Sequence, residues 1–270
     1  MPELPEVETV KRGIRPHIEG QTIVDVIVRE ARLRRPVPPN LPDLLRGQRI
    51  LDVARRAKYL CLDMPHGALI IHLGMSGSLQ FVPLGTPPKK HDHIDLIFEK
   101  TCLRYHDPRR FGLMLWQPGP ALVHPLLSAL GPEPLSADWC ARDLQQALHN
   151  RRIPIKAAIM EQKVVVGVGN IYANEALFKA GIHPQRPANS LNIADCTRLV
   201  EEIRQVLSRA IEAGGSSLRD FVDAKGKAGY FQQSYFVYGR DGENCRVCSA
   251  PLQSCRIGQR SSYYCPLCQS

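Results

Sequence analysis

Apolar residues at the start of the chain recur with the period of a helix. Within residues 5–14, Val7, Val10 and Ile14 fall on one stripe, and Pro5 suits the first helical turn. Acidic residues in that turn favour the positive end of the helix dipole. The pattern therefore predicts an amphipathic helix over residues 5–14.

From about residue 20 to residue 117 the pattern changes to short apolar runs of strand length. The runs span residues 22–28, 49–53, 59–64, 68–73, 78–82, 94–98, 103–106 and 112–116. Proline and glycine clusters such as 65–67 and 83–88 mark the turns between them. So many short strands without intervening helices predict an antiparallel β-sandwich or barrel.

A helical period returns beyond residues 117–134, where prolines and glycines indicate a boundary. Residues 192–214 give the clearest helical pattern, which Gly214 and Gly215 end. The apolar face of this helix comprises Leu199, Val200, Ile203, Val206, Leu207, Ala210 and Ile211. Another helix is predicted at residues 138–149. Two more, joined by a turn at 166–170, are predicted within residues 155–180.

The composition is typical of a globular chain with a sizeable core. Hydrophobic residues make up 44% of the 270 residues and charged residues 23%. The longest apolar runs, such as 68–71 and 164–166, are too short to cross a bilayer. The first residues contain acids and prolines instead of an apolar leader. We therefore expect neither a membrane protein nor a secreted one, and a cytoplasmic location.

The charge is strongly basic, with 35 Lys and Arg against 26 Asp and Glu and a net charge of +9. From Arg29 to Lys58 there are nine basic residues and only three acidic ones, so this segment carries a net charge of +6. Most of the nine are arginines, whose planar fork suits phosphate. The balance favours a nucleic-acid partner over the alternative, an ordinary basic enzyme.

Nine cysteines fall into two groups. Cys245-x2-Cys248 and Cys265-x2-Cys268 are separated by sixteen residues, a spacing that matches a zinc site of four thiolates. Two disulfides, or a redox pair, fit poorly in a chain without a secretion signal. We expect one structural Zn²⁺, with Cys255 outside the site. Core packing is the expected role of Cys61, Cys102, Cys140 and Cys196.

The N-terminus offers a candidate nucleophile. Because Pro2 is small, we expect removal of Met1 to expose the secondary amine of Pro2. An α-amine has a pKa of roughly 8, and its neutral form can attack an electrophilic sugar carbon to give an iminium. Glu3 and Glu6 could then transfer protons. The alternative is that the Met-Pro start is incidental and that acids in a first turn serve only as caps.

Gly167 and Gly169 follow a run of valines, but they do not form a dinucleotide-binding loop, since Tyr172 occupies the third glycine position. A sharp turn between helices is the better interpretation. Its backbone amides, with Asn170 and the following helix N-terminus, would face a phosphate. A helical hairpin without a ligand is the alternative.

Motifs along the whole chain resemble those of the bacterial formamidopyrimidine-DNA glycosylases of the Fpg/Nei family. The resemblance begins with PELPEVETV at residues 2–10 and ends with Gln259, Arg260 and the zinc cysteines. Between them lie RRAKYL (55–60), HLGMSG (72–77), KHDH (90–93), DPRRFG (107–112), VGNIY (168–172), GYF (229–231) and VYGR (237–240). The motifs occur in family order, and their combination is specific although no single one is.

The resemblance implies an α+β multidomain fold. It consists of an N-terminal antiparallel β-sandwich with an N-terminal helix, a helix–two-turn–helix domain and a C-terminal zinc-finger β-hairpin. On this basis we place the β-sandwich catalytic domain at residues 1–118, a linker at 119–134, the helix–two-turn–helix DNA-binding domain at 135–235 and the zinc finger at 236–270.

The resemblance also implies base-excision repair of double-stranded DNA by a bacterial enzyme that acts as a monomer. Such an enzyme cuts the glycosidic bond of oxidised purines, such as 8-oxoguanine and formamidopyrimidines. It then cleaves the strand on both sides of the abasic sugar by β,δ-elimination. It is therefore both an N-glycosyl hydrolase and an abasic-site lyase, and its action takes place at the nucleoid.

Residue roles follow from the matching positions. Pro2 matches the Schiff-base nucleophile, Glu3 its proton donor and Glu6 a supporting acid. Lys58 and Arg260 match the proton donors for β- and δ-elimination. DNA-binding positions are His72, Met75, His91, Arg109, Phe111, Arg151, Asn170 and Tyr238.

Three of these DNA-binding positions, Met75, Arg109 and Phe111, match the side chains that fill the gap left by the extruded base. An unbranched chain and a planar ring suit a vacated base stack, and an arginine fork suits the orphaned base. The alternative for each is core packing or a surface charge. Residues 225–229 are a candidate loop over the flipped base, or otherwise a plain connector.

Two other functions stay open. An enzyme of the endonuclease VIII type would share the proline chemistry but prefer oxidised pyrimidines; the N-terminal motif and the Met75, Arg109 and Phe111 set favour the first hypothesis. A non-catalytic zinc-ribbon DNA-binding protein would explain the charge and the cysteines but would leave Pro2 and Glu3 without a role.

Overall fold

The computed structural model describes residues 2–215 and 234–270, and these divide into two compact units. Residues up to Ser128, with the segment that starts at Ala213, form unit 1. Residues 129–212 and those from 233 onward form unit 2. Within the described residues, no helix is long and apolar enough to cross a membrane.

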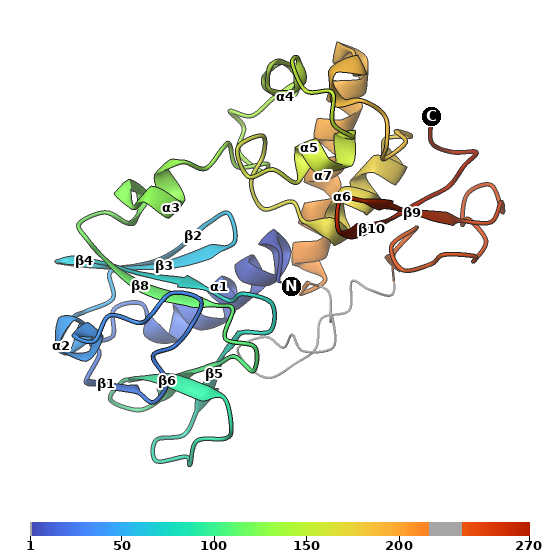
Figure 1. Cartoon of the computed structure of the whole chain (residues 1–270). Coiled ribbons are helices and arrows are strands. Elements are labelled where there is room, and N and C mark those ends of the chain that lie inside the picture. Colours follow the sequence, from blue (N-terminus) through green and yellow to red (C-terminus); the bar gives the residue numbers. More distant parts are fainter. Residues whose placement is uncertain (1, 216–233) are drawn as a thin grey trace. The chain divides into compact units, whose positions relative to one another are not determined.

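Unit 1 is a two-layered β-sandwich with a helix at its N-terminus (Figure 1). Helix α1 spans Leu4–Ile18. One antiparallel sheet has the order β1 (Asp25–Val28), β6 (Asp92–Ile97), β7 (Cys102–His106) and β5 (Ser78–Val82). The other has the order β2 (Asp52–Arg56), β3 (Tyr59–Met64), β4 (Gly67–His72) and β8 (Leu113–Pro118). The predicted sandwich is confirmed.

Both sheets and α1 share one hydrophobic core. Leu60 and Ile71 come from one sheet, Leu79 and Leu96 from the other, and Ile14 from α1; all are at most 1% exposed. Burial of such aliphatic side chains is the main favourable contribution to folding of the unit. It also brings the N-terminal residues against the sandwich.

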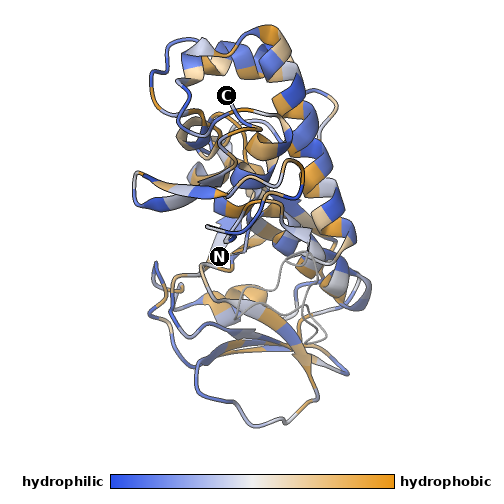
Figure 2. Cartoon of the chain, turned by 90° about the vertical axis from the view of Figure 1, so that its right-hand side faces the viewer, coloured by the Kyte–Doolittle hydropathy of each residue, from blue (hydrophilic) through white to orange (hydrophobic). Residues whose placement is uncertain are grey.

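Unit 2 combines helices with a β-hairpin. Its elements are α4 (Ala141–Leu148), α5 (Ile155–Ile159), α6 (Asn170–Lys179), the short helix η2 (Ala188–Ser190), α7 (Ile193–Glu212), β9 (Gln253–Ile257) and β10 (Arg260–Tyr264). All seven residues of the predicted apolar face of α7 are buried. Figure 2 shows hydrophobic and hydrophilic positions alternating around this long helix. Gly214 and Gly215 follow it with φ of +76° and +81°.

Most predicted elements are confirmed, and the differences arise from tertiary contacts. The expected helix at 5–14 continues to Ile18, which is fully buried, despite Pro16 in its last turn. The strand expected at 49–53 lies instead at Asp52–Arg56, because this segment pairs with β3 in the register Asp52↔Asp63 to Arg56↔Tyr59. Hydrogen-bond pairing outweighs the apolar run in placing the strand.

Short helices went unpredicted. They are η2 of unit 2, α2 (Leu41–Leu45), η1 (Ala121–Val123) and α3 (Pro125–Ser128). The last two lie in the predicted linker 119–134, so part of that segment is ordered helix. The finer domain boundaries at 118, 134 and 235 stay predictions.

One cysteine prediction is wrong. Cys61, Cys102 and Cys196 are buried as expected, but Cys140 is exposed. Cys140 precedes α4 as its N-cap, and its backbone N–H donates to Asp143 Oδ2 at 2.7 Å. A cap position lies at the surface end of a helix, so the amphipathic pattern of the helix does not extend to it.

The burial of α1 predicts a large effect of truncating Ile14. Ile14→Ala should lower the free energy of unfolding by about 2–5 kcal/mol, because it removes buried methyl groups and leaves a cavity. Val24→Ala is the matched control: Val24 is 53% exposed, and its change should stay within about 0.5 kcal/mol. Urea unfolding of both variants provides the measurement, and equal losses would contradict this account of the core.

Candidate functional site

The predicted site residues fall into one set in each unit. Unit 1 contains Pro2, Glu3, Glu6, Lys58, His72, Met75, His91, Arg109 and Phe111. Unit 2 contains Arg151, Asn170, Tyr238, Arg260 and the four zinc cysteines. Residues 225–229 lie outside the described residues.

The first residues of the chain are held by a capping box. Pro2 is buried, and Glu3 and Glu6 are each 2% exposed. Glu3 is the N-cap of α1, and its backbone N–H donates to Glu6 Oε2 at 2.8 Å. Glu6 therefore acts as a helix cap, which is the alternative role predicted for acids in the first turn. The hydrogen bond also fixes the backbone directly after Pro2. Gly215 lies against Glu6, since a Cβ there would be 3.2 Å from Glu6 Oε1.

Lys58 lies in the tight turn between β2 and β3. The pair Arg56↔Tyr59 closes this turn, and Ala57 has a φ of +54°. Arg55 supports the turn from one side, because its guanidinium donates to the Ala57 carbonyl oxygen at 3.0 Å and to Glu8 Oε2 at 3.0 Å. The ion pair links the turn to α1. Lys58 itself is 7% exposed.

His72, at the end of β4, is neutral at pH 7. Burial, and then the positive charge of Lys58, lowers the pKa of its imidazole to about 4. Its Nδ1 accepts a hydrogen bond from the backbone N–H of Gly74 at 2.9 Å, and its ring lies 4.8 Å from that of Tyr59. His72 is therefore a neutral neighbour of Lys58 and anchors the start of the loop that carries Met75.

Met75, Arg109 and Phe111 are presented to solvent on loops that adjoin β4 and β8. Met75 is 38% exposed and Phe111 is 46% exposed, values that exclude core packing for both. The Arg109 guanidinium carbon lies 4.9 Å from the centre of the Phe111 ring, within cation–π distance. The alternative of core packing is therefore wrong for Met75 and Phe111.

His91 has a strained backbone at the start of β6, with a φ of +75°. Its ring centre lies 6.1 Å from those of His93 and of His106. Burial, and then the charge of Lys90, lowers the pKa of His91. His106 is held in turn by Asp92, whose Oδ1 lies 2.7 Å from His106 Nδ1.

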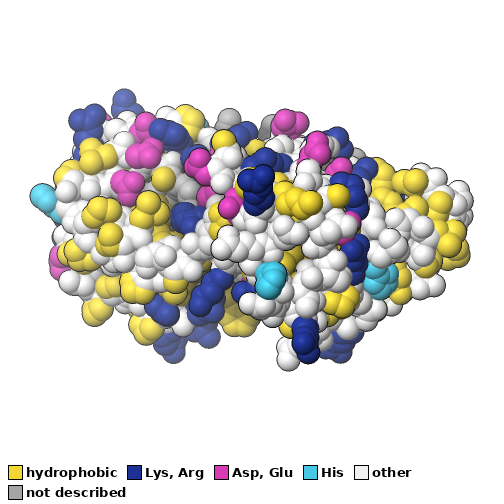
Figure 3. All heavy atoms as spheres, turned by 90° about the horizontal axis from the view of Figure 1, so that it is seen from above, with side chains coloured by type: hydrophobic (Ala, Val, Ile, Leu, Met, Phe, Trp, Pro, Cys, Tyr) yellow, Lys and Arg dark blue, Asp and Glu magenta, His cyan; other side chains and the backbone are white. Residues whose placement is uncertain are grey.

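The basic segment from Arg29 to Lys58 is only partly available to a polyanion. Several of its arginines form ion pairs in the described structure: Arg29 with Asp95, Arg32 with Glu30, Arg46 with Asp25 and Arg55 with Glu8. Figure 3 shows basic and acidic side chains interspersed on one face of the molecule. Net charge alone therefore does not locate the interface.

In unit 2, Asn170 begins α6 directly after its N-cap Gly169. The Asn170 amide nitrogen donates to the Ser261 carbonyl oxygen of β10 at 3.2 Å, whereas its Oδ1 is buried and has no hydrogen-bond partner among the described residues. Arg151 lies before α5, where it forms an ion pair with Glu161 and donates to the Ala147 carbonyl oxygen. The predicted turn before α6 is confirmed; its phosphate-binding role stays a prediction.

Arg260 is the first residue of β10, opposite Ile257 across the hairpin. Lys156, only 1% exposed, holds the next residues of this strand. Its ammonium group donates to the Ser261 carbonyl oxygen at 2.8 Å and to Ser262 Oγ at 2.7 Å. Sequence reasoning missed Lys156, although a lysine within the apolar segment 153–159 was a signal of a buried charge.

Tyr238 is placed by a buried carboxylate. Glu175 Oε1 accepts the backbone N–H groups of Val237 and Tyr238, and its Oε2 accepts that of Phe236, all at 2.8–3.0 Å. Burial raises the pKa of Glu175 and these hydrogen bonds oppose the rise. Glu175 was also missed, because its partners lie about sixty residues away in the sequence.

The four predicted cysteines converge on one point. The sulfur atoms of Cys245, Cys248, Cys265 and Cys268 all lie within 4.8 Å of one another. The Cys245–Cys268 and Cys248–Cys265 sulfur distances are 3.9 and 3.4 Å. A tetrahedral Zn²⁺ with bonds of about 2.3 Å separates its sulfurs by about 3.8 Å. The residues therefore fit one zinc ion, and Cys255 lies outside the cluster, as predicted.

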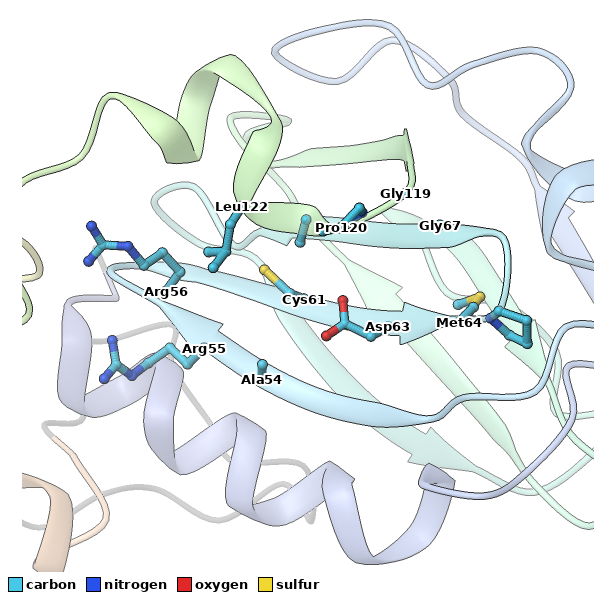
Figure 4. Close-up of a pocket in the computed structure, with 12 residues that line it drawn as sticks. Ala54, Arg55, Arg56, Cys61, Asp63, Met64, Gly67, Gly119, Pro120 and Leu122 are labelled. Atoms are coloured by element: carbon cyan, nitrogen blue, oxygen red, sulfur yellow. The ribbon is translucent and has the colours of Figure 1, made fainter.

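A separate cavity of about 580 Å³ lies on the outer side of the β2–β3–β4–β8 sheet (Figure 4). Its lining includes Ala54, Arg56, Cys61, Asp63, Met64, Pro120 and Leu122. Burial raises the pKa of Cys61 to about 12, so this thiol is not a nucleophile at neutral pH. The cavity contains none of the predicted site residues.

Comparison with known families accounts for nearly the whole chain. Residues 1–114 match the formamidopyrimidine-DNA glycosylase N-terminal domain, residues 130–222 the H2TH domain of the same family, and residues 242–270 the zinc finger found in FPG and IleRS. Among curated proteins, the formamidopyrimidine-DNA glycosylases of Methylococcus capsulatus and Pseudomonas aeruginosa are 58% and 56% identical to it, each over the full length of both chains.

Solved structures agree with these matches. A mutant Fpg of Lactococcus lactis in complex with Fapy-dG-containing DNA has a TM-score of 0.92 and 36% identity, with full coverage of both chains. The MutM (Fpg) protein of Thermus thermophilus has a TM-score of 0.89 and 39% identity, covering 99% of this chain and 98% of its own. A further Lactococcus lactis Fpg structure, with a TM-score of 0.92 and 36% identity over 99% of both chains, contains abasic-site DNA.

The sulfur geometry predicts the effect of losing one ligand. Cys248→Ser should lose its bound zinc and the protection of amide hydrogens in residues 253–264, since so small an element depends on its metal to fold. Cys255→Ser, in the same hairpin but outside the cluster, should retain one zinc per chain. Metal analysis and hydrogen exchange measure both; a fully metallated Cys248→Ser protein would contradict the four-thiolate site.

The buried His72 predicts a pH-dependent loss of stability. Its pKa in the folded state, about 4, lies below the usual 6.5, so between these values the unfolded chain binds a proton that the folded chain does not. Stability should therefore fall as the pH drops from 6.5 to 4, by roughly 3 kcal/mol from this group. NMR titration of the imidazole gives the pKa directly. In His72→Asn this part of the pH dependence should vanish; a titration near 6.5 in the native protein would overturn the prediction.

Proposed function

The chain belongs to the formamidopyrimidine-DNA glycosylase family, and we propose that it removes oxidised purines, such as 8-oxoguanine and formamidopyrimidines, from double-stranded DNA. The observation that carries this proposal is the full-length match to the family, with all three of its domains in order. The reaction belongs to base-excision repair, and we place it at the nucleoid in the bacterial cytoplasm. The bound zinc ion keeps the hairpin that carries Arg260 folded.

We assign the first chemical step to the nitrogen of Pro2, exposed when Met1 is removed. The neutral secondary amine attacks C1′ of the deoxyribose, and the bond between C1′ and the base breaks. The bound amine then loses its proton, the C1′–O4′ bond of the sugar ring opens with a proton passing to O4′, and an iminium links Pro2 to the sugar. The departing base takes a proton, for which Glu3 is the proposed donor, and Glu6 supports Glu3 through the capping box. Burial of both carboxyl groups limits competition from water.

Strand cleavage follows from the iminium. Loss of a proton from C2′ expels the 3′ phosphate, and a second elimination expels the 5′ phosphate and releases the sugar from the strand. Lys58 is the proposed proton donor for the first elimination and Arg260 for the second.

Access to C1′ requires that the damaged nucleotide leave the stack, which costs a few kcal/mol. Met75 and Phe111 are proposed to fill the vacated space and Arg109 to bind the orphaned base. Their exposure on unit 1 is the supporting observation. Backbone phosphates around the lesion are the proposed ligands of Lys58, Asn170 and Arg260. Further proposed DNA-binding residues are His72, His91, Arg151 and Tyr238.

Borohydride reduction tests the proposal, because it converts an iminium into a stable protein–DNA adduct. We expect an adduct on an 8-oxoguanine:C duplex that peptide mapping places on Pro2, and none on undamaged DNA. Pro2→Gly retains a primary amine and should give a reduced yield, whereas Pro5→Gly, the same change three residues later, should leave the yield near that of the native chain.

Each contrary outcome has a defined meaning. Faster reaction with a thymine glycol duplex would assign the chain to the endonuclease VIII type. DNA binding without any adduct would support the alternative function, a non-catalytic zinc-ribbon DNA-binding protein. An adduct mapped to a residue other than Pro2 would overturn the assignment of Pro2 as the nucleophile.

A further inference from the structure

Asp107 is fully buried at the end of β7, and the chemistry above gives it no role. Its carboxylate accepts hydrogen bonds from four donors. Oδ1 accepts from Ser76 Oγ at 2.9 Å and from the Arg109 backbone N–H at 3.3 Å. Oδ2 accepts from the Gly112 backbone N–H at 2.9 Å and from the Tyr105 hydroxyl at 3.1 Å. A carboxylate is the one side chain that can accept on both atoms from so many donors.

Three of the four donors lie in the two loops that carry the exposed side chains. Ser76 follows Met75, Gly112 follows Phe111, and the third donor is the backbone of Arg109 itself. The hydrogen bonds to the charged acceptor are of the stronger class. One buried group therefore holds the backbone of Arg109 and Gly112 directly, and holds the segment beside Met75 through the Ser76 side chain.

The same two loops are in direct contact. Gly74 has a φ of +65°, and a Cβ there would lie 2.5 Å from both the Phe111 carbonyl carbon and the Gly112 nitrogen. The backbone of Asp107 is also held, because its carbonyl oxygen lies 2.8 Å from His93 Nε2. The loops can hardly shift independently while these contacts persist.

The side chains of Met75, Arg109 and Phe111 project into solvent, so no surrounding core holds them in place. Ordering loops and side chains on binding costs conformational entropy, and a backbone fixed beforehand reduces that cost. The effect concerns only steps in which these side chains must enter the base stack.

We propose that Asp107 is a positioning residue for base extrusion: its carboxylate joins the Met75 loop and the Arg109–Phe111 loop into one preorganised element. This inference rests on the proposed function. In this proposal Asp107 contacts neither the sugar nor the base; it acts through the backbone of Arg109 and Gly112 and through the Ser76 side chain.

The test compares two reactions of the same protein. Asp107→Asn should slow single-turnover excision from an 8-oxoguanine:C duplex by at least about tenfold, since a misplacement of about 1 Å can cost more than this. Cleavage of a preformed abasic site in a single strand needs no insertion into a stack and should change little. A fluorescent 2-aminopurine beside the lesion should report slower opening of the stack.

Two further variants separate positioning from a loss of folding. Ser76→Ala keeps three of the four donors and frees only the segment beside Met75; it should lower the duplex-to-single-strand rate ratio about fivefold, the equivalent of one hydrogen bond. Asp95→Asn is the matched control, since Asp95 is a buried carboxylate in the same sandwich that bonds Arg29 and Arg104 instead of the loops. It should reduce thermal stability and leave the ratio unchanged.

The outcomes distinguish this inference from the proposed function. If the native chain neither excises 8-oxoguanine nor forms the borohydride adduct, the proposed function fails. Suppose instead that the native chain is active. If Asp107→Asn and Ser76→Ala lower the duplex and single-strand rates equally, or lower neither rate, only the positioning role fails. If Asp107→Asn does not fold, the ratio for Ser76→Ala decides.

Discussion

Buried carboxylates that accept backbone N–H groups hold the segments on which the proposed chemistry depends. Glu6 accepts the N–H of Glu3 next to Pro2, and Asp107 accepts those of Arg109 and Gly112. Glu175 does the same for residues 236–238, ahead of the zinc cysteines. In each case the charged group lies in the interior, and the residue proposed to act lies in the segment it holds. Position is thus set through the main chain of the segments that carry the residues proposed to act.

Such an arrangement needs a stable scaffold, because a buried charge costs several kcal/mol unless hydrogen bonds compensate it. The sandwich core of unit 1 supplies aliphatic burial around Asp107, and the helices of unit 2 supply it around Glu175 and Lys156. Lys156 has the corresponding role with a positive charge, because its buried ammonium group donates to the carbonyl oxygen of Ser261, the residue next to Arg260. The hairpin itself buries little apolar surface, and its four thiolates fit the metal that stabilises it.

Local sequence determined much of this molecule. The period of α7, the lengths of strands such as Tyr59–Met64 and Ser78–Val82, and the zinc spacing follow from neighbouring residues, because helical faces, strand alternation and Cys-x2-Cys turns are short-range geometry. The capping role of Glu6 could also be predicted from the sequence, because Glu6 lies only three residues after Glu3. The motifs that indicated the family needed no structure either.

Only the tertiary structure decided which of these residues act together. The place of β2 depended on pairing with β3, and the exposure of Cys140 on where α4 meets solvent. The contacts that organise the site join residues far apart in the chain: Ser76 to Asp107 across 31 positions, and Lys156 to Ser261 across 105. A hydrogen bond requires two groups within about 3 Å. No pattern along a single segment encodes that proximity, because it arises only when the cores of the two units bring distant segments together.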